Sequence, residues 1–190
     1  MGVFRNKTIY CVGGSSGIGL AAAKGLARLG AHIAVFGRDE ERLSNALEDI
    51  SACRVNASQR MLSVSMDVSR WQEVQDAMQR TTAGFGTPDI LINCAGRAYP
   101  RCFEDIGIAQ FEETIQVNLM GIIYTNVALI PSMKKKGGII VNTSSVAGLV
   151  GVFGYTDYCA SKFGIIGFSE ALRSEQKPHG IKVQVLCPPD

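Results

Sequence analysis

The sequence has no long uninterrupted apolar segment and little room for a leader. No apolar run reaches the roughly 18–20 residues that cross a bilayer, although 46% of the 190 residues are hydrophobic. A strand is expected to begin at Thr8, which leaves too few residues before it for a signal peptide. We therefore expect no transmembrane segment and a cytoplasmic location, with a peripheral association with a membrane left open.

Paired cysteines and an excess of charge of one sign are also absent. The six cysteines stand singly, with neither metal-ligand nor redox spacing, so we expect reduced thiols and no metal site. The formal net charge is only +2, which argues against a nucleic-acid partner. The lysines at 134–136 follow a long helical pattern and are interpreted as the cationic end of that helix.

What the chain does contain is a regular alternation of apolar strands and helical segments, with no repeat or linker. Strands are expected at residues 8–12, 31–36, 61–66, 89–93, 138–143 and 182–187, and helices at 17–29, 40–51, 72–82, 111–133 and 158–175. Apolar strands separated by helices indicate an α/β fold. The pattern predicts one domain, a doubly wound parallel sheet (Rossmann fold) with helices on both faces and ligands at the carboxyl ends of the strands.

The first expected strand runs into a glycine-rich turn at residues 13–19. A turn that opens a helix points free N–H groups and the positive end of the helix dipole at an anion, and pyrophosphate is the natural ligand. The phosphate loop of nucleotide hydrolases does not fit, because Leu20 stands where lysine is needed. A nucleophile elbow does fit around Ser15, but nothing upstream can supply its oxyanion loop. Cofactor contacts are therefore expected from Gly13, Ser15, Ser16, Gly17, Ile18 and Gly19.

The residues after the second strand bear on the choice of dinucleotide. An acidic side chain there holds the ribose 2′-hydroxyl of NADH, whereas an arginine accommodates the 2′-phosphate of NADPH. Arg38 is placed to do the latter, and Asp39 is interpreted as the N-cap of the next helix. We expect NADPH to be preferred over NADH. Further cofactor contacts are expected at the ends of the third and fourth strands, from Asp67, Val68, Asn93, Ala95 and Gly96.

A tyrosine and a lysine four residues apart suggest an acid–base pair. Tyr158 and Lys162 share one face of the expected last helix. A tyrosine has an ordinary pKa of about 10, and a fixed cation beside it stabilises the phenolate and lowers that pKa. The same spacing is common on surface helices, so the spacing indicates an acid–base pair only if other motifs in the chain support that interpretation.

Together these motifs resemble the short-chain dehydrogenase/reductase family over essentially the whole chain. The likeness rests on the turn at 13–19, Asp67-Val68, the segment 93–96, Asn118, Ser144-Ser145 and Tyr158-x-x-x-Lys162, with Ser145 thirteen residues before Tyr158. Val12 departs from the threonine usual before the first glycine, and residues 188–190 (Pro-Pro-Asp) stand where Pro-Gly is usual.

The resemblance implies a role for each catalytic residue. Ser145 would hydrogen-bond the substrate carbonyl, and Tyr158 would donate a proton to the developing alkoxide. Lys162 would lower the pKa of Tyr158 and hold the nicotinamide ribose, while Asn118 would anchor a water linking Lys162 to solvent. Pro188 is expected to contact the cofactor. Family members usually assemble by packing their fourth and fifth helices against those of another copy. The resemblance therefore implies a homodimer or homotetramer.

A more specific similarity is to the 3-ketodihydrosphingosine reductases, which reduce the 3-keto group of a sphingoid base with NADPH. It is carried by the segments 103–105, 151–156, 160–163, 169–172, 177–178 and 187–190. The implied function is the reduction of such a lipid-like ketone. A 3-oxoacyl thioester or steroid as substrate, or a non-catalytic dinucleotide-binding module, stay as alternatives. Val152, Phe153 and Tyr155 suit either an apolar tail groove or helix packing.

Relatives in the family carry a substrate-covering segment after the sixth strand and usually a seventh strand. The resemblance therefore implies that residues 1–190 form one NAD(P)-binding domain without that lid and without the last strand.

Overall fold

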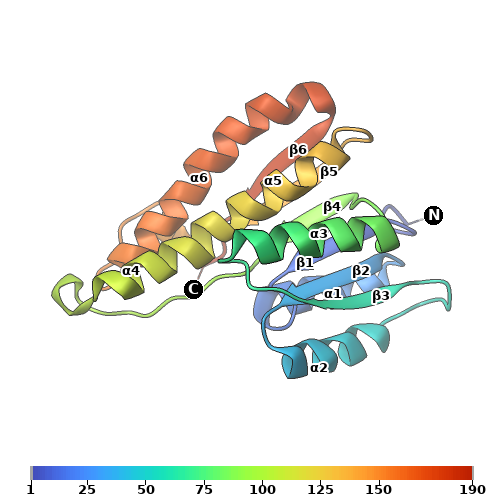
Figure 1. Ribbon diagram of the computed structural model, residues 1–190, viewed down its shortest axis with the longest axis horizontal. Coiled ribbons are helices and arrows are strands. Elements are labelled where there is room, and N and C mark those ends of the chain that lie inside the picture. Colours follow the sequence, from blue (N-terminus) through green and yellow to red (C-terminus); the bar gives the residue numbers. More distant parts are fainter. Residues whose placement is uncertain (1, 190) are drawn as a thin grey trace.

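A parallel sheet of six strands forms the centre of the computed structural model, which describes residues 2–189 (Figure 1). Asp190, part of the unusual Pro-Pro-Asp sequence, lies outside the described residues. The strands are β1 (Thr8–Val12), β2 (His32–Gly37), β3 (Met61–Ser65), β4 (Ile90–Asn93), β5 (Gly138–Thr143) and β6 (Ile181–Leu186). Their order is β3-β2-β1-β4-β5-β6, so the winding reverses between β1 and β4. This reversal is where doubly wound sheets bind ligands.

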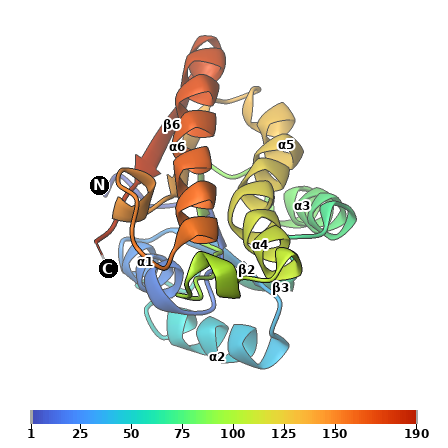
Figure 2. The same cartoon turned by 90° about the vertical axis from the view of Figure 1, so that its left-hand side faces the viewer.

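Helices cover both faces of the sheet, which confirms the predicted fold class. On one side lie α1 (Gly17–Arg28) and α2 (Glu40–Ser51). On the other lie α3 (Trp71–Phe85), α4 (Ile108–Ile115), α5 (Gly121–Met133) and α6 (Thr156–Gln176), as Figure 2 shows end-on. Short 3₁₀ turns occupy Phe103–Asp105, Val146–Gly148 and Lys177–His179.

Alternate side chains of the strands point to opposite faces of the sheet, and each face carries a separate core. In β1, Tyr10 and Val12 face the core under α3, α5 and α6, whereas Ile9 and Cys11 face the core under α1 and α2. This division follows from the two-residue period of a strand. Burying each large apolar side chain contributes roughly 1.5–3 kcal/mol. The hydroxyl of Tyr10 donates to the carbonyl of Gly86 at 2.8 Å, so this buried polar group is satisfied.

The α1–α2 face is covered unevenly. Its core is built on β1, β2 and β4, while Ile139 and Val141 of β5 are only partly buried at its margin. Among residues 2–189 no helix lies over β5 and β6 on this side. That half of the sheet therefore presents side chains at the surface.

The predicted single helix at 111–133 is interrupted. It begins at Ile108, and a π-helical turn at Gln116–Met120 separates α4 from α5. Such turns widen a helix locally and often occur at functional sites. Asn118 lies within this turn and is buried.

The stretch Ile108–Met133 is also long and apolar enough to span a membrane by length and composition, with a mean hydropathy of 1.2. Counting uninterrupted apolar runs in the sequence missed it, because polar residues are interspersed. In the fold α5 packs against α3 and α4 against α6, and Thr125 and Asn126 on its inner side are hydrogen-bonded in the core. These contacts are those of a core helix.

Candidate active site

Two adjoining cavities lie at the carboxyl ends of the strands, where the winding reverses. The larger, about 400 Å³, is lined by residues after β4 and β5 and by the start of α6. The smaller, about 200 Å³, is lined by the glycine-rich turn and by the ends of β2 and β3. Gly96 lines both. Together they form an elongated cleft of the kind that takes a dinucleotide.

The glycine-rich turn fits an anion in two ways. Gly17 has a φ of +52°, and a Cβ built on it would meet nothing within 4 Å, so the space beside it is open. Ser16 is the N-cap of α1, and its side chain makes no capping bond. The first N–H groups of α1 therefore lack a side-chain partner and are available to a pyrophosphate.

Other glycines of the turn are needed for close packing. A Cβ on Gly13, whose φ is +78°, would lie 2.5 Å from the backbone nitrogen of Ala95, so the turn touches the segment after β4. A Cβ on Gly19 would collide with the carbonyl of Gly13. The replacement of the usual threonine by Val12 leaves the backbone pairing in place, because Gly13 N donates to Phe36 O at 2.8 Å.

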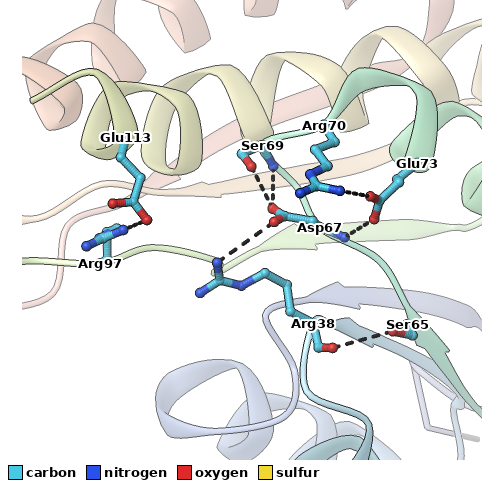
Figure 3. Close-up of polar contacts among 8 residues, drawn as sticks. All are labelled: Arg38, Ser65, Asp67, Ser69, Arg70, Glu73, Arg97 and Glu113. Carbon is cyan, nitrogen blue, oxygen red and sulfur yellow. Dashed lines mark hydrogen bonds and ion pairs between the residues drawn. The ribbon is translucent and has the colours of Figure 1, made fainter. Parts of the chain in front are cut away.

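The smaller cavity carries arginines from the end of β2 and the start of α2. Arg38 lines it, is exposed, and lies with Nη1 3.8 Å from Asp67 Oδ2 (Figure 3). The other oxygen of Asp67 accepts from the backbone N–H and hydroxyl of Ser69. Asp39 caps α2 as predicted, accepting from Arg42 N at 3.0 Å. Arg42 lines the same cavity and was missed in the sequence, where only the residue next to the strand end was considered.

Ser145, Tyr158 and Lys162 all line the larger cavity. Lys162 is 4% exposed. Its Nζ donates to the carbonyl of Thr143 at 3.0 Å and lies 5.3 Å from the centroid of the Tyr158 ring. Burial lowers the pKa of Lys162 from 10.5 to about 8, so at pH 7 the side chain is still mainly an ammonium. The structure thus places a cation beside the phenol.

Two consecutive serines connect the end of β5 to α6. The hydroxyl of Ser144 donates to the backbone carbonyl of Lys162 at 2.9 Å. Ser145 caps the short turn Val146–Gly148, its Oγ accepting from Ala147 N at 3.0 Å. This bond uses a lone pair of Ser145 and leaves its hydroxyl hydrogen for a carbonyl oxygen in the cavity.

Both the oxygen and the nitrogen of the Asn118 side-chain amide form hydrogen bonds. Oδ1 accepts from Arg97 N at 2.8 Å, and Nδ2 donates to Arg97 O at 2.9 Å and to Ser161 Oγ at 3.1 Å. A Cβ on Gly96 would lie 3.4 Å from Asn118 Oδ1 and 3.7 Å from Lys162 Nζ. Asn118 and Lys162 therefore face the same spot. The bridging water expected there stays a prediction.

The remaining predicted cofactor residues divide into lining and buried ones. Those lining the cleft are Gly13, Ser15, Ser16, Ile18, Val68, Ala95, Gly96 and Pro188. Asn93 instead lies in the core, where its amide donates to Asn142 Oδ1 at 2.9 Å and accepts from Thr125. Its side chain braces β4 against β5 and α5, and its part in cofactor binding stays a prediction.

Arg97 and Cys94, which line the larger cavity, were also missed in the sequence. Arg97 forms an ion pair with Glu113 (Figure 3), and its guanidinium lies 4.4 Å from the ring centroid of Tyr99. Cys94 Sγ lies 3.2 Å from Thr143 Oγ1, and burial raises the pKa of its thiol. The sequence signal that could have identified these two residues as part of the site is their nearness to Gly96.

Comparison with known proteins agrees with this geometry. The family model described as short chain dehydrogenase matches residues 7–190. The chain is 39% identical over 184 residues to 3-ketodihydrosphingosine reductase of Mus musculus, covering 96% of this chain and 55% of the mouse protein. It is 35% identical to 3-oxoacyl acyl-carrier-protein reductase of Chlamydia muridarum, covering 96% of this chain and 73% of that protein.

A solved structure shows the same fold. NAD⁺-bound xylitol dehydrogenase superposes with a TM-score of 0.93 at 28% identity, covering 98% of this chain and 71% of that one. The chain spans little more than half the length of the 3-ketodihydrosphingosine reductases it matches in Mus musculus and Bos taurus. By sequence, fold and the arrangement of its cleft, the chain belongs to the short-chain dehydrogenase/reductase family.

Proposed function

We propose that this chain forms the catalytic part of an NADPH-dependent ketoreductase. The observation that carries the proposal is that Ser145, Tyr158 and Lys162 line one cavity. This cavity meets, at Gly96, a second one that carries the glycine-rich turn and two arginines. A proton-donating group and a place for a dinucleotide therefore belong to one cleft.

The residues of the turn fit the dinucleotide. The open space at Gly17 and the uncapped N-terminus of α1 suit the pyrophosphate. When bound, the reduced nicotinamide supplies hydride, and the protein supplies position and protons. Ala95 and Gly96 present little side chain to the cleft, so a ring can lie against their backbone.

The proton chemistry belongs to the larger cavity. The hydroxyl of Ser145 donates to the substrate carbonyl, which orients it. Tyr158 then transfers its phenolic proton to the oxygen that gains negative charge. Lys162, an ammonium at pH 7, favours the phenolate left behind. The bond from Lys162 to Thr143 O fixes the cation at one point of the wall.

The preference for NADPH rests on Arg38 and Arg42. Both line the cavity at the end of β2, where a 2′-phosphate would lie. Each has an acidic neighbour, Asp67 and Asp39 respectively, but these ion pairs lie at the surface and are weak. A phosphate carrying two charges competes well for the guanidinium groups.

The proposed substrate is 3-ketodihydrosphingosine. The mouse relative bears that name, and large apolar side chains are exposed within five residues, along the chain, of Ala98, Ser145 and Tyr158, which line the larger cavity. Phe153 is 88% exposed, Phe103 66% and Leu149 58%. Arg101 N donates to Gly154 O at 2.8 Å, which holds together the two loops that carry them. Such a surface suits an alkyl tail and a peripheral location at a membrane.

A homodimer or homotetramer is part of the same proposal. Val127 on α5 and Phe163 on α6 are exposed apolar residues on two long helices, and a second copy would bury them. Light scattering of the purified chain tests this.

The direct test is turnover. The protein is incubated with NADPH and 3-ketodihydrosphingosine, beside acetoacetyl thioester and beside NADH, and NADPH oxidation is followed. We expect oxidation with the sphingoid ketone and a slower reaction with NADH. Faster reduction of the thioester would mean that the substrate is a 3-oxoacyl compound and not the sphingoid ketone. Reduction of a 3-oxoacyl compound is the reaction that the name of the Chlamydia muridarum relative describes. Dinucleotide binding without any turnover would instead identify a non-catalytic module.

A further inference from the structure

A fully buried carboxyl group lies in the first turn of α6, directly before Tyr158. Asp157 is 0% exposed and does not line either cavity of the cleft. Its Oδ2 accepts a hydrogen bond of 2.7 Å from the hydroxyl of Thr114, which lies on α4 and is also 0% exposed. Within the described part of the chain no ion pair reaches Asp157. Burying a carboxyl group in this way costs folding free energy, which indicates a task that an apolar residue would not perform.

The other oxygen of Asp157 contacts Tyr158 itself. Asp157 Oδ1 accepts from Tyr158 N at 2.7 Å. An N–H group in the first turn of a helix has no partner within that helix, so this bond satisfies it and fixes the peptide unit that carries the phenol. The positive end of the helix dipole favours an acidic side chain at this position.

The carbonyl of Tyr158 is held in a similar way. Ser161 Oγ donates to Tyr158 O at 2.7 Å and accepts from Asn118 Nδ2 at 3.1 Å. Asn118 lies in the π-helical turn that follows α4, and α4 packs against α6 (Figure 1). The backbone N–H and the backbone carbonyl of Tyr158 are therefore each linked, through one side chain, to the same helical segment at 108–120.

We propose that Asp157 and Thr114 are positioning residues for the proton-transfer step, an inference that rests on the proposed function. Their hydrogen bond sets the first turn of α6 against α4 and thereby holds the phenol of Tyr158 where the substrate oxygen accepts its proton. A general acid acts only within hydrogen-bond reach of that oxygen, and a displacement of about 1 Å lowers the rate on the order of 100-fold. Because neither residue lines the cleft, the pair governs the chemical step and not the affinity for NADPH.

Two pairs of variants separate this hydrogen bond from packing. Thr114→Val and Asp157→Leu keep nearly the original volume and break the bond. Thr114→Ser keeps the hydroxyl, and Asp157→Asn keeps both contacts, because an amide donates to the Thr114 hydroxyl and still accepts from Tyr158 N. Thr81→Val is the matched control, since Thr81 is a buried threonine of α3 outside both cavities.

Single-turnover kinetics give a readout that loss of stability does not change. Each protein is loaded with NADPH and mixed rapidly with 3-ketodihydrosphingosine or, in parallel, with the acetoacetyl thioester, and NADPH absorbance is followed. The rate constant of a single turnover does not depend on how much of the protein is folded, whereas its amplitude does. The dissociation constant of NADPH is measured by fluorescence on the same samples.

We expect the rate constant to fall about tenfold or more in Thr114→Val and Asp157→Leu, with NADPH affinity changed less than about threefold. In Thr114→Ser, Asp157→Asn and Thr81→Val it should stay within about threefold of the unmodified protein. An unchanged rate constant in Thr114→Val and Asp157→Leu would overturn the inference and leave the proposed function standing, even if the amplitudes fell. Equal losses in Thr114→Ser and Thr114→Val would also overturn it, because packing would then be the cause. No turnover of either ketone by the unmodified protein would overturn both.

Discussion

At the scale of single residues, the account depends on a lysine that burial makes easier to deprotonate. Lys162 is almost fully buried, its ammonium donates to the neutral carbonyl of Thr143, and its pKa falls to about 8. The same burial keeps the ammonium close to Tyr158, where its charge is screened little by water. A surface lysine at the same helical spacing would have less effect on a tyrosine.

This burial predicts how stability depends on pH. In the unfolded chain Lys162 titrates near 10.5 and in the folded protein near 8, so below pH 8 both states are protonated and the cost of burying the charge is fully present. Between pH 8 and 10.5 only the unfolded state holds the proton, so folding becomes more favourable as pH rises. Relative to Lys162→Met, the unmodified protein should gain up to about 3 kcal/mol across this window. Urea denaturation of both proteins measures it, and a constant difference would contradict it.

The arginines of the smaller cavity predict cofactor selectivity. Arg38→Asp should lower the ratio of kcat/KM for NADPH over NADH by roughly 100-fold, since it removes a cation and adds a charge that repels phosphate. Arg42→Ala should lower the ratio less, by about tenfold. Arg70→Ala, in the Arg70–Glu73 ion pair of Figure 3, is a control outside that cavity. An unchanged ratio in Arg38→Asp would show that the phosphate is held elsewhere.

At the scale of elements, two glycines of the first turn serve different purposes. Gly17 has open space around it, and Gly13 touches the segment after β4. Gly17→Ala should therefore cost stability only about 1–2 kcal/mol, the strain of a left-handed residue, while raising KM for NADPH at least tenfold. Gly13→Ala should destabilise the whole fold, because the new methyl would overlap Ala95.

Thermal unfolding and NADPH titration of both variants test this assignment. Normal NADPH affinity in Gly17→Ala would contradict the placement of pyrophosphate at this turn.

The sequence predicted the elements well for a physical reason. Central strands of a parallel sheet are apolar on both faces, and the segments at β1, β2 and β4 show this directly. The π-helical turn at Gln116–Met120 was not predicted, since a single extra residue in a helical turn barely alters the hydrophobic period. It orients Asn118 toward Arg97 and Ser161, which only three-dimensional contacts reveal.

At the scale of the whole molecule, the cleft is assembled by topology. Tyr158 and Lys162 could be paired from their spacing, but their meeting with Gly96 depends on strand order. The network that braces this region could not be read from the sequence either. Asn142 Nδ2 donates to Ser169 Oγ at 3.0 Å, and Asn142 Oδ1 accepts from Asn93. These buried amides join β4, β5 and α6 beneath the cleft, and the residues involved are far apart in the chain.

The measurement that tests the central claim most directly is NADPH oxidation by Tyr158→Phe in the presence of 3-ketodihydrosphingosine, with NADPH affinity measured by fluorescence on the same sample. The phenol donates the proton and the dinucleotide is bound by other residues as well. We therefore predict turnover reduced by at least 1,000-fold with NADPH affinity changed less than about threefold. Turnover within tenfold of the unmodified protein would contradict the account.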